Sequence, residues 1–485
     1  MFFNIPQKPS RYIQDFLFSK KLLKEDSYIP IGIIFAIALY VPFEDIITVW
    51  LPLPSAGQSL FRAIPELTIY FLFARIIYLR ITLGLGFRRT AIDSLVAAFF
   101  LSCTISVLIN QASFRSSYNY LRESWRYLTV YYVLVNIEIP HGKVKTLVEH
   151  IKNIGILQGI LASIQFFLPG HLKVTMAGGG CEKALLKGAS CGSFIDSATL
   201  AGFLLIAIAI LITYVINHPE KYLKQPKNII IVLLALFGLF ASKKRASLLI
   251  LSVLPITIIG LSRKKKTLRK YIWLLMSLAI GLLFIVPFLI ANFGLVTQES
   301  SAVAQTDISS YFLRIFSPEY WDDFLLNARG WFIALTVKSL SESGSWFFGF
   351  SPDHGTTIST INSLIVSASD AAKLARDQYV FQDAFWFAQL AYYGIIGLSL
   401  YWSILLSLYR SSCRLLKTTQ WPEFQSLGII FCAVIMIGFL YSFSERLFVL
   451  RTYSYYFWLF AGLIANAEYT QKKLRELLNK MDHIN

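Results

Sequence analysis

Three consecutive cations occupy a short turn between two strongly apolar stretches of the sequence. The turn is Ala-Ser-Lys-Lys-Arg-Ala-Ser over 241–247, and its basic residues are Lys243, Lys244 and Arg245. Neighbouring cations repel one another and resist removal from water, so a persistent anionic ligand would explain their position. Arginine can hold phosphate oxygens through two parallel hydrogen bonds, whereas lysines act as mobile point charges. The pattern predicts a diphosphate site, and a solvated turn or contact with lipid headgroups is the alternative.

Two other groups of cations are candidates for the same site. Arg122 and Arg126 are four residues apart and therefore share one face of a predicted helix. Their alternative role is to extend from the membrane toward the interface. Arg329 lies in Asn-Ala-Arg-Gly-Trp over 327–331 and is followed by Trp331. An isolated arginine is usually a surface charge, whereas tryptophans 321, 331 and 346 could stack on the apolar faces of sugar rings.

Acidic residues near membrane boundaries are candidates for proton transfer. Asp383 lies in Tyr-Val-Phe-Gln-Asp-Ala-Phe-Trp over 379–386, where its carboxylate could accept a proton from a hydroxyl group. An ordinary helix N-cap is the alternative. Glu44, Asp45 and Asp196 also fall within or beside apolar stretches. We expect them to be internal ion-pair partners of arginines such as Arg75 or Arg122.

The cysteines and histidines show no spacing typical of a metal centre. The chain has five cysteines without a Cys-x-x-Cys motif, and six histidines without metal-ligand spacing. No metal and no other cofactor is therefore expected. Cys181 and Cys191 lie ten residues apart in one predicted external connection, where they could form a disulfide or remain free thiols.

The composition indicates an integral membrane protein, so the candidate residues are expected to be positioned by membrane helices. Of 485 residues, 55% are hydrophobic and 15% charged, against roughly 45–50% and about 25% in soluble domains. The mean hydropathy is +0.57. These values argue against a soluble enzyme. Residues 228–240 are apolar on every face, which excludes the alternating pattern of a membrane β-barrel. We predict an all-α polytopic protein.

Apolar windows of about 20 residues predict about twelve transmembrane helices. They begin near Tyr28, Leu60, Ile92, Arg122, Ile151, Phe194, Asn228, Ala246, Tyr271, Asp383, Phe424 and Arg451. The predicted segments are a cytoplasmic N-terminus (1–27), helices 1–9 (28–297), a large periplasmic loop (298–382), helices 10–12 (383–468) and a cytoplasmic tail (469–485). The loop keeps several tryptophans among its polar residues, which favours a folded helical cap.

The distribution of basic residues predicts the orientation. Lysine and arginine exceed aspartate and glutamate, 45 against 28, and they concentrate in alternate connections. Because basic residues accumulate in cytoplasmic loops, both termini should be cytoplasmic and the loop external. The membrane explains the positive charge, so no nucleic-acid partner is expected.

Several motifs together resemble a known family. Four motifs occur in an order similar to that of O-antigen ligases and Wzy-type O-antigen polymerases. They are the turn Gly192-Ser193-Phe194 before a helix, the basic turn at 242–247, Arg329 with Trp331 and Phe348-Gly349-Phe350, and Asp383 followed by Gly394. The likeness covers most of the chain from about Tyr28.

The resemblance implies a GT-C-like fold in the bacterial inner membrane. It implies a metal-independent glycosyltransferase that uses an undecaprenyl-diphosphate-linked glycan on the periplasmic face. Arg245 and Arg329 would bind the diphosphate and Asp383 would be the base, with Lys243, Lys244, Arg122, Arg126 and Trp331 binding substrate. Asp383 stands where the ligases carry histidine, which favours polymerisation over ligation.

The expected partners are the lipid-linked donor, a glycan acceptor, the bilayer and, in the polymerase interpretation, a chain-length regulator protein. A transporter or flippase of lipid-linked oligosaccharide is the alternative function.

Overall fold

The computed structural model describes residues 28–51, 54–167, 181, 184–185, 188–217, 225–262, 317–319, 329–364, 374 and 383–482. Within these ranges all regular structure is helical and no strand occurs. The elements are α2 (Tyr28–Tyr40), η1 (Val41–Phe43), α3 (Glu44–Trp50), α4 (Ser55–Thr82), α5 (Asp93–Ile109), α6 (Phe114–Trp125), α7 (Leu128–Asn136), α8 (His141–Phe167), α11 (Ser197–Asn217), α13 (Pro226–Ala241), α14 (Arg245–Leu261), α18 (Arg329–Ser343), α19 (His354–Ser363), α21 (Phe385–Thr418), α22 (Pro422–Tyr441), η4 (Leu447–Val449) and α23 (Arg451–Asp482).

Apolar helices support a membrane-embedded protein. Four helical segments are long and apolar enough to cross a bilayer: Tyr28–Trp50, Ser197–Asn217, Phe385–Thr418 and Pro422–Tyr441. Three shorter apolar helices are Asp93–Ile109, Pro226–Ala241 and Arg245–Leu261. The predicted ninth span, from Tyr271, lies outside the described residues. The total of twelve spans therefore stays a prediction.

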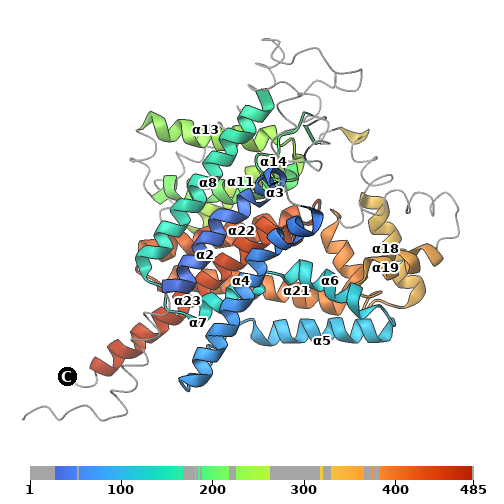
Figure 1. Ribbon diagram of the computed structural model, residues 1–485, viewed down its shortest axis with the longest axis horizontal. Coiled ribbons are helices and arrows are strands. Elements are labelled where there is room, and N and C mark those ends of the chain that lie inside the picture. The colour runs from blue at the N-terminus through green and yellow to red at the C-terminus, as the bar shows by residue number, and fades with distance from the viewer. Residues whose placement is uncertain are drawn as a thin grey trace, which may run out of the picture.

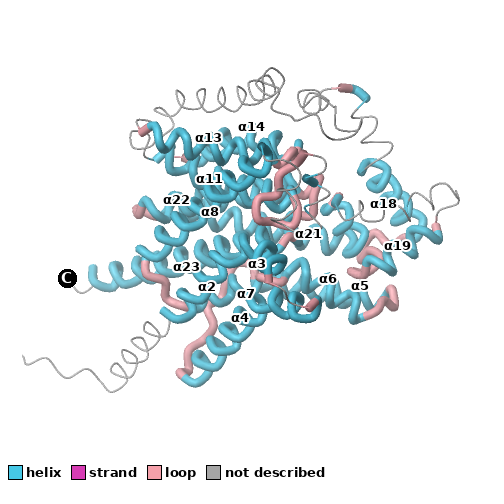
Figure 2. Tube along the Cα trace, turned by 45° about the horizontal axis from the view of Figure 1, so that its top comes forward, coloured by secondary structure: helices cyan, strands magenta, loops and turns pink. Residues whose placement is uncertain are grey.

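The helices pack in successive layers around α11. Figure 2 shows α13 and α14 along one side, α11 beneath them, and α22 and then α23 further on, with α7 and α4 beyond. Because α11 is surrounded, nearly all of its side chains are buried. Helices α18 and α19 lie beside α21, to one side of this bundle (Figure 1).

Small residues allow the closest helix contacts. A Cβ atom built on Gly159 of α8 would lie 2.9 Å from the carbonyl oxygen of Leu234 in α13. One built on Gly238 of α13 would lie 2.7 Å from the Cα atom of Gly159. Backbones approach this closely in membrane bundles where glycine leaves room for them.

The fourth predicted span is divided into two helices. The amphipathic α6 ends at Trp125, and α7 begins at Leu128 after a turn at Arg126 and Tyr127. The nine residues of α7 extend only about 14 Å at 1.5 Å per residue, less than the roughly 30 Å of a hydrocarbon core. A continuous span from Arg122 therefore does not form.

Side chains from other helices and loops donate hydrogen bonds to the carbonyl groups at the C-terminal end of α7. Arg80 and Arg88 donate to the carbonyl oxygens of Asn136 and Val135, each at 2.9 Å. Asn466 of α23 donates to a third carbonyl oxygen, that of Leu134, at 2.8 Å. These donors satisfy carbonyl groups that the helix itself leaves without partners. Helix α23 continues to Asp482, so the predicted tail from 469 extends the last helix.

Candidate functional site

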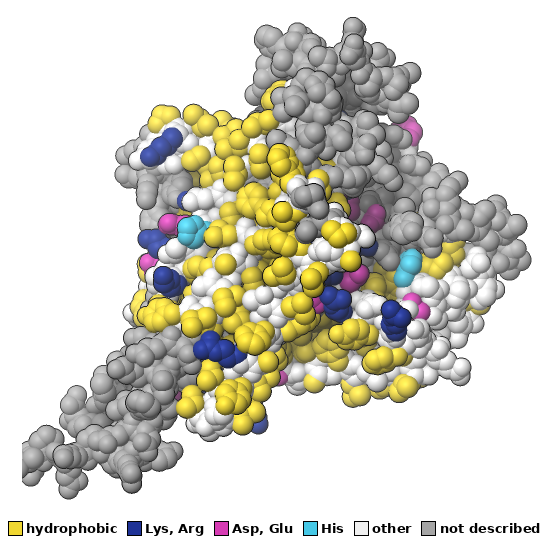
Figure 3. Space-filling view, viewed as in Figure 1, with side chains coloured by type: hydrophobic (Ala, Val, Ile, Leu, Met, Phe, Trp, Pro, Cys, Tyr) yellow, Lys and Arg dark blue, Asp and Glu magenta, His cyan; other side chains and the backbone are white. Residues whose placement is uncertain are grey.

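Acidic and basic side chains gather at the opposite end of the bundle, where α3, α4, α11, α14 and α23 begin. We call this region the charged end. Its members are Glu44, Asp45, Arg62, Glu66, Arg122, Arg126, Asp196, Lys243, Lys244, Arg245, Asp383, Glu445, Arg446 and Arg451. Figure 3 shows dark blue and magenta side chains grouped to the right of centre, beside a broad hydrophobic face.

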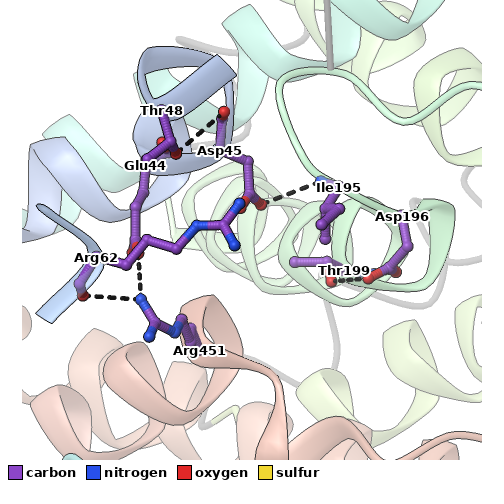
Figure 4. Close-up of polar contacts among 8 residues, drawn as sticks. All are labelled: Glu44, Asp45, Thr48, Arg62, Ile195, Asp196, Thr199 and Arg451. Atoms are coloured by element: carbon purple, nitrogen blue, oxygen red, sulfur yellow. Dashed lines mark hydrogen bonds and ion pairs between the residues drawn. The ribbon is translucent and has the colours of Figure 1, made fainter. Parts of the chain in front are cut away.

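A buried ion pair joins α3 to α23. Arg451, the first residue of α23, forms an ion pair with Glu44, which is only 3% exposed. The same nitrogen of Arg451 donates to the backbone oxygen of Arg62 at 2.8 Å, so the guanidinium group connects α3, α4 and α23 (Figure 4). A carboxylate that is buried from solvent requires such pairing, because desolvation of an unpaired charge is costly.

Asp45 connects α3 to the start of α11. Its carboxylate accepts a hydrogen bond from the backbone nitrogen of Ile195 at 3.0 Å and lies 3.6 Å from Arg62 (Figure 4). The next residue, Asp196, accepts from the backbone and hydroxyl of Thr199 at 2.7 and 2.9 Å. Asp196 therefore caps α11 as a short polar side chain at a helix start should.

Two buried glutamines of α8 hold the Gly192-Ser193-Phe194 turn. Gln165 accepts from the backbone nitrogens of Cys191 and Gly192, at 3.0 and 2.8 Å. Gln158 accepts from the backbone nitrogen of Ser193 at 3.0 Å. Cys191 also forms a disulfide with Cys181, which decides between the two alternatives left open by the sequence. The turn leads directly to Asp196.

The basic turn and Asp383 lie within electrostatic range of each other. Lys244 forms an ion pair with Glu445, with Nζ and Oε1 2.7 Å apart. Burial lowers the pKa of Lys244, but the negative charges of Glu445, Asp196 and Asp383 outweigh burial and raise it above its usual value. The structure thus pairs Lys244 with Glu445, and Asp383 is a predicted site residue whose charge also acts on Lys244.

The backbone conformation of the turn sets the positions of its other two cations, Lys243 and Arg245. Lys243 has a left-handed φ of 51°, and its Nζ lies 2.7 Å from the position of a Cβ built on Gly188. Arg245 is the half-buried first residue of α14. The left-handed residue reverses the chain between α13 and α14, so the turn faces the segment that carries the disulfide.

Arg122 has a carboxylate partner of its own. Its Nε and Nη2 lie 2.6 and 2.8 Å from the two carboxylate oxygens of Glu66 in α4. Glu44 and Asp45 are internal ion-pair partners as expected, but their arginines are Arg451 and Arg62. The arginine named as an example, Arg122, pairs with Glu66 instead. Helix α3 directs the carboxylates of Glu44 and Asp45 toward Arg451 of α23 and Arg62 of α4. Helix α6 contacts α4 one turn further along, at Glu66.

Asp383 is not the N-cap of α21. The N-cap residue is Ala384, whose side chain has no hydrogen-bonding group. The half-buried Asp383 lies one residue earlier, where its charge acts on Lys244. The structure thus removes the N-cap alternative.

The predicted loop residues are only partly described. Arg329 begins α18, but its side chain and residue 321 lie outside the described part of the structure. Trp331 is half-buried and meets Phe332 edge-on, with ring centroids 4.8 Å apart. Convergence of Arg329 and Arg245 on one ligand stays a prediction.

Two motifs that are distant in sequence dock against each other. Helix α21 is interrupted at Gly394 (φ 64°, ψ −170°), and residues 346–351 pair with the interruption. Phe350 donates to the carbonyl oxygen of Ala391 at 2.7 Å, and Ile395 donates to that of Trp346 at 2.8 Å. The loop thereby satisfies backbone groups that an interrupted helix leaves without partners.

Replacing Gly394 with alanine should undock this segment. The new Cβ would lie 2.4 Å from the carbonyl carbon of Phe347, and the left-handed φ adds about 1–2 kcal/mol for any other residue. Gly344→Ala is the matched control, because Gly344 has φ 69° but no atom within 4 Å of the built Cβ. Thermal unfolding in detergent should show a larger loss for Gly394→Ala, and equal losses would contradict the docking.

A second polar network lies beside the docked segment. His354 at the start of α19 is 2.9 Å from the hydroxyl of Tyr392, through Nδ1. Burial lowers the pKa of His354, and the nearby Arg446 also lowers it against the opposing charge of Asp353. Its imidazole is therefore neutral at pH 7 and able to accept a proton.

No protein-family model and no curated protein matches the chain. Among the residues that the structure describes, no three histidine, cysteine or acidic side chains are grouped so that they could hold a metal ion.

Sequence reasoning did not select the connection between α22 and α23. Glu445 pairs with Lys244 of the basic turn, and Arg451 pairs with Glu44. The charge of Arg446 acts on His354 and lowers its pKa. The sequence contained an indication, because this connection carries two arginines on the side where the orientation rule predicts few cations. Arg62 and Glu66 were also missed, since they lie inside a predicted span.

Proposed function

We propose that the protein is a membrane glycosyltransferase that transfers or polymerises undecaprenyl-diphosphate-linked oligosaccharide at its charged end. The main support is the placement of Asp383 within electrostatic range of Lys244, in a region where Arg126, Arg245 and Arg451 also lie. A proton acceptor and several cations at one end of a helical bundle suit transfer from an anionic leaving group.

In the proposed reaction, an acceptor hydroxyl attacks the anomeric carbon of the donor glycan. A new glycosidic bond forms, the bond from the anomeric carbon to the diphosphate oxygen breaks, and the lipid diphosphate leaves with the electron pair. The hydroxyl proton passes to Asp383, and His354 is a second group able to accept it. Negative charge grows on the leaving diphosphate, so fixed cations stabilise the transition state more than the ground state.

The proposal places the charged end on the periplasmic side of the bacterial inner membrane, with both termini in the cytoplasm. The acceptor is a second lipid-linked glycan in the polymerase interpretation and a lipid core in the ligase interpretation. Polymerisation is preferred, and a chain-length regulator protein would then be a partner. Arg329 and Trp331 would enter the site from the loop.

Incubation of purified protein with undecaprenyl-diphosphate oligosaccharide alone tests this proposal. We expect a ladder of longer glycans without an added core acceptor, and the ladder should persist in EDTA because the proposed step uses no metal. Product that appears only after a lipid core is added would favour ligation. Absence of any glycan product under both conditions would contradict the proposal.

Transport of the same lipid-linked donor is the competing function. A flippase needs polar groups along a path through the bilayer, whereas the two least exposed carboxylates in ion pairs among the described residues, Glu44 and Glu66, both lie at the charged end. Movement of donor across the membrane of reconstituted vesicles, without glycosidic bond formation, would support the flippase instead.

A further inference from the structure

A cavity of about 270 Å³ lies between the starts of α8 and α22. Its lining residues are Gly142, Lys145, Trp421, Glu423 and Phe424. The volume is slightly below the roughly 300–1,000 Å³ of pockets that enclose drug-sized ligands, so the cavity suits a group of the size of a lipid headgroup and not an oligosaccharide. None of these residues belongs to the charged end.

The cavity and the charged end lie at opposite ends of α22. The cavity is at the start of this helix, whereas Glu445 and Arg446 of the charged end follow its last residue, Tyr441. The 20 residues of α22 extend about 30 Å at 1.5 Å per residue. The same helix is long and apolar enough to cross a bilayer. A ligand in the cavity is therefore separate from the proposed glycan donor and lies where a membrane meets water.

Two aromatic side chains form the apolar part of the cavity. The rings of Trp421 and Phe424 meet with centroids 5.4 Å apart. Phe424 is buried, and Trp421 is half-buried. Thr419 holds the connection before α22, because it accepts from the backbone nitrogen of Trp421 and from the side chain of Gln425, each at 3.1 Å. Tryptophan is enriched at membrane–water boundaries, and its ring face can attract a cation.

Two exposed charges of opposite sign complete the cavity. Lys145 and Glu423 both line it, and neither forms an ion pair with a residue that the structure describes. The cavity therefore carries one positive and one negative charge, which is complementary to a net-neutral group that carries both signs. The carboxylate of Glu423 opposes an anionic headgroup, and the ammonium group of Lys145 opposes a purely cationic one.

We propose that this cavity binds the headgroup of phosphatidylethanolamine, a phospholipid that carries a primary ammonium group and a phosphate. The ammonium group donates hydrogen bonds to Glu423 beside the ring of Trp421, and the phosphate accepts from Lys145. A choline headgroup has no N–H donor for Glu423 and is therefore bound less tightly. The site goes beyond the proposed function, because it needs neither the glycan donor nor the charged end.

Lipid titration of the full-length protein in detergent, followed by native mass spectrometry, tests the proposal. Phosphatidylethanolamine should bind about 10-fold more tightly than phosphatidylcholine with the same acyl chains, as expected for charge-assisted hydrogen bonds. Glu423→Gln should remove this preference, and Lys145→Gln should weaken the binding of both lipids. The control Lys143→Gln removes an equal charge from an exposed position outside the cavity and should bind as wild type.

The same titration can overturn the proposal in three ways. Equal affinity of the wild type for the two lipids would do so, and so would an unchanged preference in Glu423→Gln. Tighter binding of phosphatidylglycerol than of phosphatidylethanolamine would show a general attraction of anionic lipid to basic side chains. Because the substituted positions are exposed, the unfolding temperature without added lipid should match that of wild type, so that changed binding does not reflect misfolding.

Carbodiimide coupling locates the headgroup in the wild-type protein. The reagent activates a carboxylate, the unprotonated amine of bound phosphatidylethanolamine attacks the activated carbon, an amide bond forms, and the reagent leaves as a urea. Peptide mass spectrometry should find this amide at Glu423 well above the level at Glu149, an exposed glutamate of α8 outside the cavity. Equal coupling of the two glutamates would place the lipid elsewhere and overturn the proposal.

Discussion

Asp383→Asn is expected to reduce glycan polymerisation by at least about 100-fold, because the amide cannot accept the proton of the attacking hydroxyl. The variant should still be folded and bind the donor, because asparagine has nearly the size and shape of aspartate and the N-cap of α21 is Ala384. The rate of ladder formation at saturating donor measures this. Glu342→Gln is the control, because it removes an exposed carboxylate of α18 that pairs with Lys338 four residues away.

The same experiment can show whether His354, and not Asp383, is the base. Full activity in Asp383→Asn with loss in His354→Gln would move the base to the imidazole. Because the pKa of His354 is lowered by burial, the imidazole loses its proton below the ordinary value of about 6.5. If His354 is the base, the rate of glycan formation should fall only when the pH decreases through that lowered pKa. The rate should be at its full value at pH 7.

Glu44→Gln should destabilise the protein by about 3–5 kcal/mol, the usual effect of removing one partner from a buried ion pair. Glu44 is 3% exposed and its partner Arg451 connects α3, α4 and α23, so the remaining guanidinium loses its counter-charge. Denaturant unfolding in mixed micelles should show the loss as a lower free energy of unfolding.

A double variant separates this ion pair from general damage to the helix ends. Glu44→Gln combined with Arg451→Met should recover much of the loss, because no unpaired charge remains. The exposed pair Lys338–Glu342 is the matched control, and Glu342→Gln should change stability by less than about 1 kcal/mol. Strictly additive losses in the double variant would show that Glu44 and Arg451 act independently.

The apolar helices could be predicted because their sequences leave few alternatives. Helices α11, α13, α14 and α22 each begin within about four residues of a predicted start, since long apolar runs favour a buried or membrane helix in any context. The division of α6 from α7 at Arg126 could not be predicted in this way. Periodicity alone does not show where a polar side chain will end a helix inside the fold.

The charged end was predictable in composition but not in pairing. Unusual cations selected Lys244 and Arg126, and an acidic helix entry selected Asp383. The partners, however, come from distant segments: Arg451 and Glu44 are separated by 407 positions, and Lys244 and Glu445 by 201. The interruption of α21 at Gly394 has the same origin, because the backbone groups that satisfy it belong to residues 346–351. Only the folded arrangement reveals such contacts.

The account is tested most directly by counting products in one reaction. Purified wild-type protein and undecaprenyl-diphosphate oligosaccharide should yield one free undecaprenyl diphosphate for each new glycosidic bond, and Asp383→Asn should yield neither above background. Glycan ladders formed without release of lipid diphosphate, or release of lipid diphosphate without new glycosidic bonds, would contradict transfer from a lipid diphosphate at the charged end.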